Sequence, residues 1–114
     1  MKSPMLPAER ALHVLVAEDN AVNQLLLTSM LQRMGHTATC VENGRLAVEA
    51  AANGHFDIVL MDMQMPEKDG PTATRLIRRM EGEAGRVPIV GLTADTVPEH
   101  RRAYEEAGLS DFLT

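Results

Sequence analysis

Short apolar runs alternate with helical patterns along most of this chain. The runs are His13–Ala17, Thr37–Val41, Phe56–Met61, Pro88–Leu92 and Asp111–Thr114. The stretches 14–17, 58–61 and 89–92 are continuously apolar, which is typical of parallel strands covered by helices on both faces. The alternation therefore predicts βαβ units and a layered α/β domain with a parallel sheet.

The first two helices are predicted from apolar spacing and from their end signals. The apolar residues of the first are Val22, Leu25, Leu26, Met30 and Met34. Asp19 or Asn20 is expected to cap this helix at its start, and Gly35 to follow its end. Asn43 is expected to cap a second helix that ends at Gly54.

Two further helices are predicted in the second half of the chain. Pro71 is expected at the first position of the third helix, because proline fits where a helix has no use for its N–H. Pro98 is expected to open the fourth, which ends at Gly108. Residues 82–86, which include Gly82 and Gly85, are predicted to form a surface loop.

Composition limits the classes of protein that this chain fits. A length of 114 residues corresponds to one domain. The net charge of −5 argues against a nucleic-acid partner, which would require a basic face. The single Cys40 and the lack of a run near ~20 apolar residues favour a cytoplasmic setting without a membrane span. Residues 1–10 lack the apolar core of a signal peptide and are predicted to be a leader or linker before the domain at 11–114.

Acidic residues follow two of the apolar runs. Glu18 and Asp19 come after the first run, and Asp62 comes after the third. If the strand order is 2-1-3-4-5, the crevice at the carboxyl ends of strands one and three receives all three side chains. Crowded carboxylates raise one another's pKa unless a cation is present, and Mg²⁺ fits this donor set better than Ca²⁺. The alternative is that each acid is an ordinary helix cap or loop acceptor.

Four segments carry a resemblance to a known family: "LVAEDNAVNQ", "DIVLMDMQMPEKDG", "PIVGLTAD" and "EEAGLSDFLT". Together they resemble the receiver domain of two-component response regulators, particularly the receivers of hybrid sensor histidine kinases, over residues 12–114. The spacing from Asp62 through Pro66 to Gly70, with Thr93 after the fourth strand, makes the match specific. The resemblance implies a doubly wound, five-stranded parallel sheet of order 2-1-3-4-5, the flavodoxin-like (CheY-like) fold.

The resemblance also implies roles for the acidic residues. Asp62 would be the phosphoacceptor, whose carboxylate attacks a phosphohistidine. Asp19 and Asp62 would bind Mg²⁺ directly, Glu18 through water, and Gln64 through its backbone carbonyl. Metal and backbone donors would then stabilise the charged phosphoryl transition state.

Further roles follow from the same family pattern. Thr93 would be the switch hydroxyl and Phe112 the aromatic switch residue on the last strand, so that phosphorylation changes the surface of the fourth helix and that strand. Ala94 is small, as access to the phosphoryl group requires. Gln64 and Asp95 hold the positions associated with the rate of dephosphorylation. An ordinary strand threonine and a packed core phenylalanine are the structural alternatives for Thr93 and Phe112.

One feature departs from the family. A lysine is expected directly after the position matching Thr114, and neither Lys2 nor Lys68 is an obvious substitute for it. The last helix of the fold is missing as well, so the domain is expected to be incomplete at its C-terminal end. Apolar surface on strands one and five is then expected to be exposed, which favours self-association.

The predicted function is a Mg²⁺-dependent phosphoacceptor module that receives phosphate from a histidine kinase or a histidine phosphotransfer domain. Its own phosphorylation and dephosphorylation would be the chemistry that it catalyses. The parent is expected to be a hybrid sensor histidine kinase with this domain on the cytoplasmic side, and a stand-alone response regulator is the alternative. The surface along Gln24 to Thr28 is expected to dock the donor domain.

Two other classes of protein share features with this sequence. Mg²⁺-dependent aspartyl phosphohydrolases resemble D-x-D-x-T, whereas the segment here is "DMQMP", without a second Asp to act as an acid. Flavin-binding flavodoxin-like modules carry a Ser/Thr-rich phosphate loop after strand one, where Glu18 and Asp19 would repel phosphate.

Overall fold

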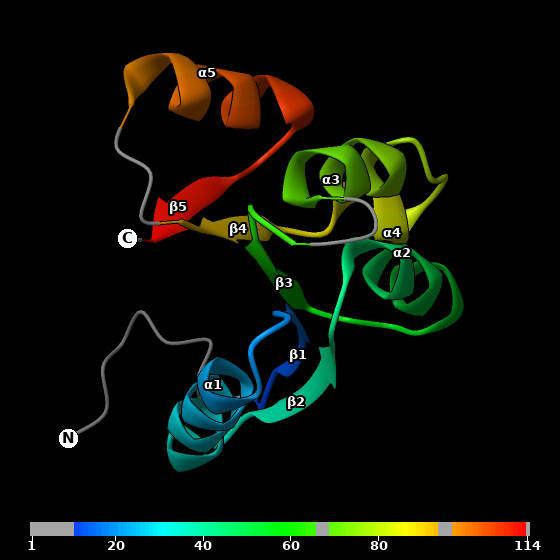
Figure 1. Cartoon of the computed structure of the whole chain (residues 1–114). Coiled ribbons are helices and arrows are strands. Elements are labelled where there is room, and N and C mark those ends of the chain that lie inside the picture. Colours follow the sequence, from blue (N-terminus) through cyan, green and yellow to red (C-terminus); the bar gives the residue numbers. More distant parts are fainter. Residues whose placement is uncertain (1–10, 66–68, 94–96, 114) are drawn as a thin grey trace, which may run out of the picture.

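Strands and helices alternate along the chain as the apolar runs predict (Figure 1). The structure, a computed structural model, describes residues 11–65, 69–93 and 97–113. Its elements in chain order are β1 (His13–Ala17), α1 (Ala21–Arg33), β2 (Thr37–Val41), α2 (Gly44–Asn53), β3 (Ile58–Asp62), α3 (Gly70–Arg78), α4 (Glu83–Arg86), β4 (Ile89–Leu92), α5 (Pro98–Ala107) and β5 (Asp111–Leu113). Residues 1–10, predicted to be a leader, lie outside the described part.

The strands form one parallel sheet of five in the order β2-β1-β3-β4-β5, which confirms the predicted topology. The order reverses between β1 and β3. In the register of these strands Ala17 lies opposite Met61, and Asp62 lies opposite Leu92 on β4. The carboxyl ends of the three central strands therefore meet at one edge of the sheet.

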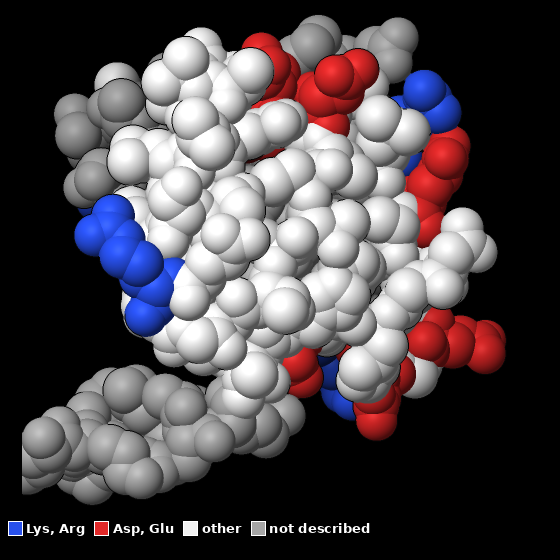
Figure 2. Space-filling model, turned by 90° about the horizontal axis from the view of Figure 1, so that it is seen from below, with Lys and Arg blue, Asp and Glu red and all other residues white. Residues whose placement is uncertain are grey.

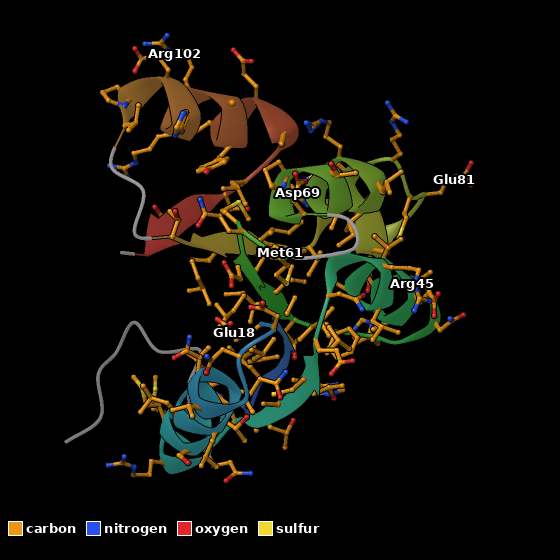
Figure 3. The ribbon with its side chains drawn as sticks, viewed as in Figure 1. Glu18, Arg45, Met61, Asp69, Glu81 and Arg102 are labelled. Atoms are coloured by element: carbon orange, nitrogen blue, oxygen red, sulfur yellow. The ribbon has the colours of Figure 1, made fainter. Side chains whose placement is uncertain are left out.

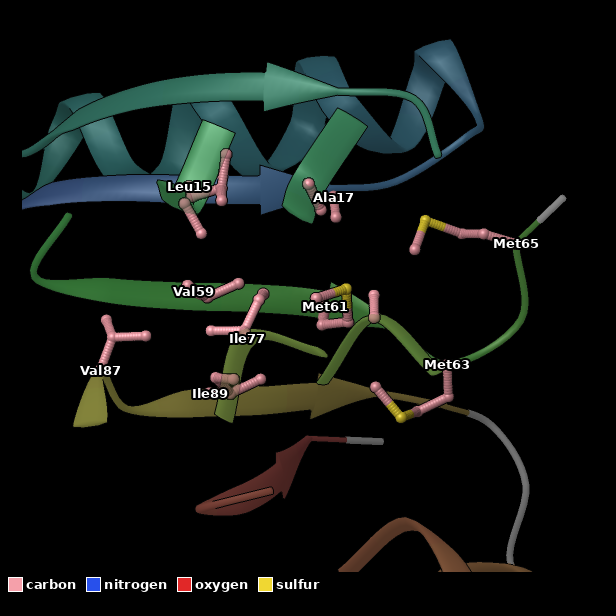
Figure 4. Close-up of a cluster of buried hydrophobic side chains, with 12 residues drawn as sticks. Leu15, Ala17, Val59, Met61, Met63, Met65, Ile77, Val87 and Ile89 are labelled. Carbon is pink, nitrogen blue, oxygen red and sulfur yellow. The ribbon is translucent and has the colours of Figure 1, made fainter. Parts of the chain in front are cut away.

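Each face of the sheet has its own apolar core. On one face, side chains from β1, β3 and β4 pack against α2 and α3 (Figure 4). The fully buried members of this core include Leu15, Val59, Met61, Ile77 and Ile89. On the other face, Val14, Val16 and Leu60 pack against Leu27 and Leu31 of α1. Helices on both faces explain why the central strands are continuously apolar.

Helix α1 contacts the sheet through a different stripe from the one that predicted it. Val22, Leu25, Leu26, Met30 and Met34 keep helical spacing, but their exposed fractions are 72%, 68%, 55%, 47% and 59%. No residue of α1 is fully buried, and the half-buried Leu27 and Leu31 make its apolar contact with the sheet. The molecule seen from below carries few charged side chains over the middle of its surface (Figure 2).

The expectation of exposed apolar surface on strand one was wrong. Residues 14–17 of β1 are at most 1% exposed, because α1 covers one face of this strand and α2 covers the other. Most of the exposed large apolar side chains among the described residues lie on α1 and at its C-cap instead. Side chains of Phe112 and Leu113 on β5 are not described, so the same expectation for strand five stays a prediction.

The helix ends agree closely with the local signals. Asn20 and not Asp19 caps α1, since its Oδ1 accepts a hydrogen bond from the N–H of Asn23 at 3.0 Å. Asn43 caps α2 in the same way through the N–H of Leu46 at 2.8 Å. Gly35, with φ of +91°, follows the C-terminal end of α1 and takes the left-handed conformation that favours glycine.

The predicted surface loop at 82–86 contains one helical turn, α4, so this prediction was wrong in part. The half-buried Arg78 accounts for the order of this turn. Its guanidinium donates hydrogen bonds to the carbonyls of Gly85 and Val87, and also to the carbonyl of Gly108 and the hydroxyl of Ser110. Arg78 thus ties the turns before β4 and β5 to the end of α3.

Candidate functional site

Three carboxylates at the ends of two strands meet at the carboxyl edge of the sheet. Glu18 and Asp19 follow β1 directly, and Asp62 is the last residue of β3. One carboxylate oxygen from each of the three residues lies within 4.8 Å of the others. The parallel register of β1 and β3 brings them together although more than forty positions separate them in the sequence. Figure 3 shows Glu18 in the turn between β1 and α1.

The three side chains differ in burial and in the hydrogen bonds that hold them. Glu18 is 5% exposed, and its Oε2 accepts a hydrogen bond from the N–H of Asn20 at 3.0 Å. Asp62 is half-buried, and its Oδ1 accepts one from the N–H of Gln64 at 2.9 Å. Asp19 is exposed. A ligand therefore reaches the cluster from the side of Asp19 and Asp62.

Burial and mutual repulsion both act on this cluster. Burial is the largest cause that raises the pKa of Glu18 above 4.5, and the charge of Asp62 raises it further, against the Asn20 N–H. Burial likewise raises the pKa of Asp62 above 3.8, and the charge of Asp19 adds to this. The N–H of Gln64 and the side chain of Glu18 act in the opposite direction on the pKa of Asp62. The metal-free site thus holds its negative charge at a free-energy cost.

The donor set fits a hard divalent cation. All the side-chain ligands in the cluster are carboxylate oxygens, with no histidine or cysteine among them. Mg²⁺ is usually held by one or two carboxylates together with waters and phosphate oxygens, which this partly open cluster allows. A bound cation would also remove the repulsion that raises the two pKa values.

Comparison with known families identifies the domain. The family model of the response regulator receiver domain matches residues 14–114. The chain belongs to this family. The resemblance read from the four sequence segments is therefore confirmed, and the chain is a receiver domain, the phosphoacceptor module of phosphorelays.

Two similar proteins are sensor proteins of pseudomonads. The chain is 42% identical over 109 residues to the Sensor protein GacS of Pseudomonas syringae pv. syringae, covering 94% of this chain but 12% of GacS. The receiver domain of the sensor histidine kinase PA1611 from Pseudomonas aeruginosa, whose crystal structure has a magnesium ion coordinated in the active site cleft, is 39% identical with a TM-score of 0.85. That match covers 92% of this chain and 85% of the other.

A third relative is a receiver solved together with a partner. It is the receiver domain of Ssk1 from Saccharomyces cerevisiae, in a co-crystal structure with the histidine phosphotransfer protein Ypd1. It is 32% identical to this chain, with a TM-score of 0.84 and coverage of 91% and 78%.

Three further predicted residues, Gln64, Thr93 and Phe112, lie at or near the same edge. Gln64 is exposed and its backbone N–H points to Asp62. Thr93 follows β4 directly and is half-buried. Phe112 pairs with Gly91 in the sheet, but its side chain is not described. Ala94 and Asp95, like Lys2, Lys68 and Thr114, lie outside the described residues.

Two residues near the acids make backbone contacts that the spacing in the sequence did not predict. The side chain of Gln24 donates a hydrogen bond to the backbone carbonyl of Glu18 at 2.5 Å. Gly70 lies so close to β3 that a Cβ atom there would be 2.5 Å from the carbonyl oxygen of Asp62. Gly70 belongs to the spacing that carried the resemblance, but no local signal showed its contact. Gln24 belongs to the segment that is predicted to dock the donor domain, and helical spacing does not indicate which polar side chain of a helix contacts the preceding loop.

Proposed function

We propose that Asp62 accepts a phosphoryl group from a phosphohistidine in a reaction that depends on Mg²⁺. The convergence of Glu18, Asp19 and Asp62 within 4.8 Å carries this proposal. In the reaction a carboxylate oxygen of Asp62 forms a bond to phosphorus while the bond between phosphorus and the imidazole nitrogen breaks. The imidazole leaves with the electron pair of that bond, and the hydrogen bond from the N–H of Gln64 orients the attacking carboxylate.

Four groups would hold the metal: the carboxylates of Asp19 and Asp62, Glu18 through water, and the backbone carbonyl of Gln64. Bound Mg²⁺ would supply positive charge that offsets the carboxylates and the phosphoryl oxygens. Glu18 is fixed by burial and by Asn20, so it contributes charge from a constant position. The magnesium ion in the PA1611 receiver supports this assignment.

The response to phosphorylation is proposed to pass through Thr93 and Phe112. Thr93 would donate its hydroxyl to a phosphoryl oxygen, and Phe112 would follow its movement, so that the surface of α5 and β5 changes. Arg78 holds the turn before β5 through hydrogen bonds to the carbonyl of Gly108 and the hydroxyl of Ser110. The movement on phosphorylation is therefore proposed to occur at the carboxyl end of β5. Gln64 and Asp95 would tune the lifetime of the phosphate.

The phosphodonor is proposed to be a histidine kinase or a histidine phosphotransfer domain, and the parent a hybrid sensor histidine kinase. The chain spans 12% of the length of GacS, so the rest of such a parent lies outside the sequence described here. None of the helices among the described residues is long and apolar enough to cross a bilayer. We place the domain on the cytoplasmic side, and the exposed stripe of α1 supports a further capacity for self-association.

Phosphorylation of the natural full-length protein tests the central proposal. With acetyl phosphate and Mg²⁺, mass analysis should find one added phosphoryl group on the peptide that contains Asp62. Asp62→Ala should abolish this modification, and chelation of Mg²⁺ should do the same. Asp69→Asn, which removes a nearby charge but keeps an N-cap for α3, should be modified normally. Modification of a different residue would refute the assignment.

A separate experiment tests the docking surface. Leu25 on α1 and Met34 at its C-cap are both exposed, at 68% and 59%. Leu25 lies near the acidic end of the helix and Met34 at the opposite end. Leu25→Ser should slow phosphotransfer from a donor domain without slowing the reaction with acetyl phosphate, whereas Met34→Ser should affect neither. Equal transfer rates for both variants and the wild type would contradict docking on this part of α1.

A further inference from the structure

The acids that follow β1 lie on a very short connection. Glu18, Asp19 and Asn20 are the residues between β1 and α1. The N–H of Glu18 donates to the carbonyl of Val41 on β2 at 3.0 Å, and its carboxylate is held by the N–H of Asn20. Asp19 is exposed, so the position of its carboxylate depends on the backbone that carries it. That backbone begins with the peptide group joining Glu18 to Asp19.

Gln24 holds this peptide group from the helix side. Its Nε2 donates to the carbonyl of Glu18 at 2.5 Å, and this carbonyl belongs to the Glu18–Asp19 peptide. The backbone of Gln24 is itself fixed, because its N–H donates to the carbonyl of Asn20 at 2.9 Å. The half-buried side chain therefore links a rigid turn of α1 to the plane of the peptide that carries Asp19.

We propose that Gln24 is a positioning residue that preorganises Glu18 and Asp19 for the cation, an inference that rests on the proposed Mg²⁺ site. A neutral amide suits this place for two reasons. It donates to a carbonyl without adding positive charge that would compete with a cation for the carboxylates. A glutamate at the same position would set an oxygen against the carbonyl of Glu18 and add negative charge beside the cluster.

The size of the effect follows from what such outer contacts do at metal sites. Removing a hydrogen bond that orients a metal ligand typically lowers metal affinity by about 10–100-fold. The contact here acts on the backbone of one ligand and not on a ligating side chain, so the expected loss is near the lower end, about 10-fold. Gln24 makes no proposed contact with the metal or with the phosphoryl group.

The test compares Mg²⁺ binding by the full-length protein with Gln24 and with Met at this position. Gln24→Met keeps the length of the side chain and removes the donor, and Gln32→Met makes the same change at an exposed position of α1. Calorimetric titration with Mg²⁺ should show about 10-fold weaker binding for Gln24→Met and no change for Gln32→Met. Phosphorylation by acetyl phosphate should need more Mg²⁺ in Gln24→Met, yet reach nearly the wild-type rate when Mg²⁺ saturates.

Two outcomes overturn the inference, and they are distinguishable. If the wild type binds Mg²⁺ and Gln24→Met binds it equally well, Gln24 has no positioning role, whatever the change in stability. If the wild type itself fails to bind Mg²⁺, the proposed metal site falls and the inference falls with it. Gln24→Leu guards against a folding defect in the first variant: it removes the same donor without changing the charge, so it should also bind less tightly, and wild-type affinity in this variant would equally contradict the role.

Discussion

Neutralising Asp62 should stabilise the metal-free receiver while it abolishes phosphorylation. One oxygen of each acid in the cluster lies within 4.8 Å of the others, so Asp62→Asn removes two repulsive pairs, with Glu18 and with Asp19. Two unit charges about 4 Å apart interact with about 1 kcal/mol in water and about 4 kcal/mol at an effective dielectric constant near 20. Asp19 is exposed, and salt screens its charge, so the lower figure applies to that pair. We expect a net gain of about 1–3 kcal/mol in the free energy of unfolding.

The asparagine preserves the rest of the local structure. Its Oδ1 can still accept the hydrogen bond that Asp62 receives from the N–H of Gln64 at 2.9 Å. Urea denaturation in EDTA at neutral pH measures the gain in the free energy of unfolding. The midpoint temperature of thermal unfolding should rise by about 4–8 °C for each kcal/mol in a domain of about this size. Asp69→Asn is the matched control, since it removes one charge and keeps an N-cap for α3. Its stability should change little.

Magnesium should reduce the stability difference between the two proteins. A ligand that binds the native state alone stabilises it by about 2.7 kcal/mol when its concentration is 100 times its Kd. The wild type should receive this stabilisation, whereas the variant lacks one of the proposed ligands and should receive less. Lower stability of Asp62→Asn in EDTA, or equal stabilisation of both proteins by Mg²⁺, would refute the electrostatic reasoning.

Three further predictions concern the surroundings of the cluster. Gly70→Ala places a Cβ atom 2.5 Å from the carbonyl oxygen of Asp62 and 2.6 Å from the Cα of Met63, both of which are backbone atoms. Urea denaturation should therefore show a free energy of unfolding that is lower by about 1–3 kcal/mol. Unchanged stability would mean that α3 shifts freely away from β3. Arg78→Met leaves three backbone carbonyls without their donor and should lower the free energy of unfolding by about 2–4 kcal/mol, with increased hydrogen exchange in α4 and at the start of β5. Because the pKa values of Glu18 and Asp62 are raised in the folded protein, the native state binds more protons than the unfolded chain. In EDTA, the contribution of these two residues to the free energy of unfolding should therefore fall as the pH rises from about 4 through the raised pKa values. The urea concentration at the denaturation midpoint should depend less on pH in Asp62→Asn than in the wild type. An equal pH dependence in the two proteins would contradict the assignment.

Much of the fold was predictable because its signals are local. The strands β1 and β2 have the predicted bounds, since continuous or β-branched apolar runs between turn residues specify strands with little help from distant residues. Asn43 and Gly35 mark helix ends through bonds and dihedral angles within a few positions. The convergence of the acids was predictable from the position of each acid after its strand, together with the strand order that the resemblance implied.

The tertiary structure decided which side each helix presents and which distant groups touch. Apolar spacing in α1 gives the period of the helix but not the stripe that the sheet covers, and Leu25 and Met34 proved to be exposed. The contacts of Gln24 and Arg78 with backbone carbonyls depend on turns whose paths are set by the sheet register. The sequence by itself therefore determined the elements and the acids at their ends, because these depend on neighbouring residues. The positions of those acids relative to one another depend on parallel pairing between strands far apart in the chain, which exists only after folding.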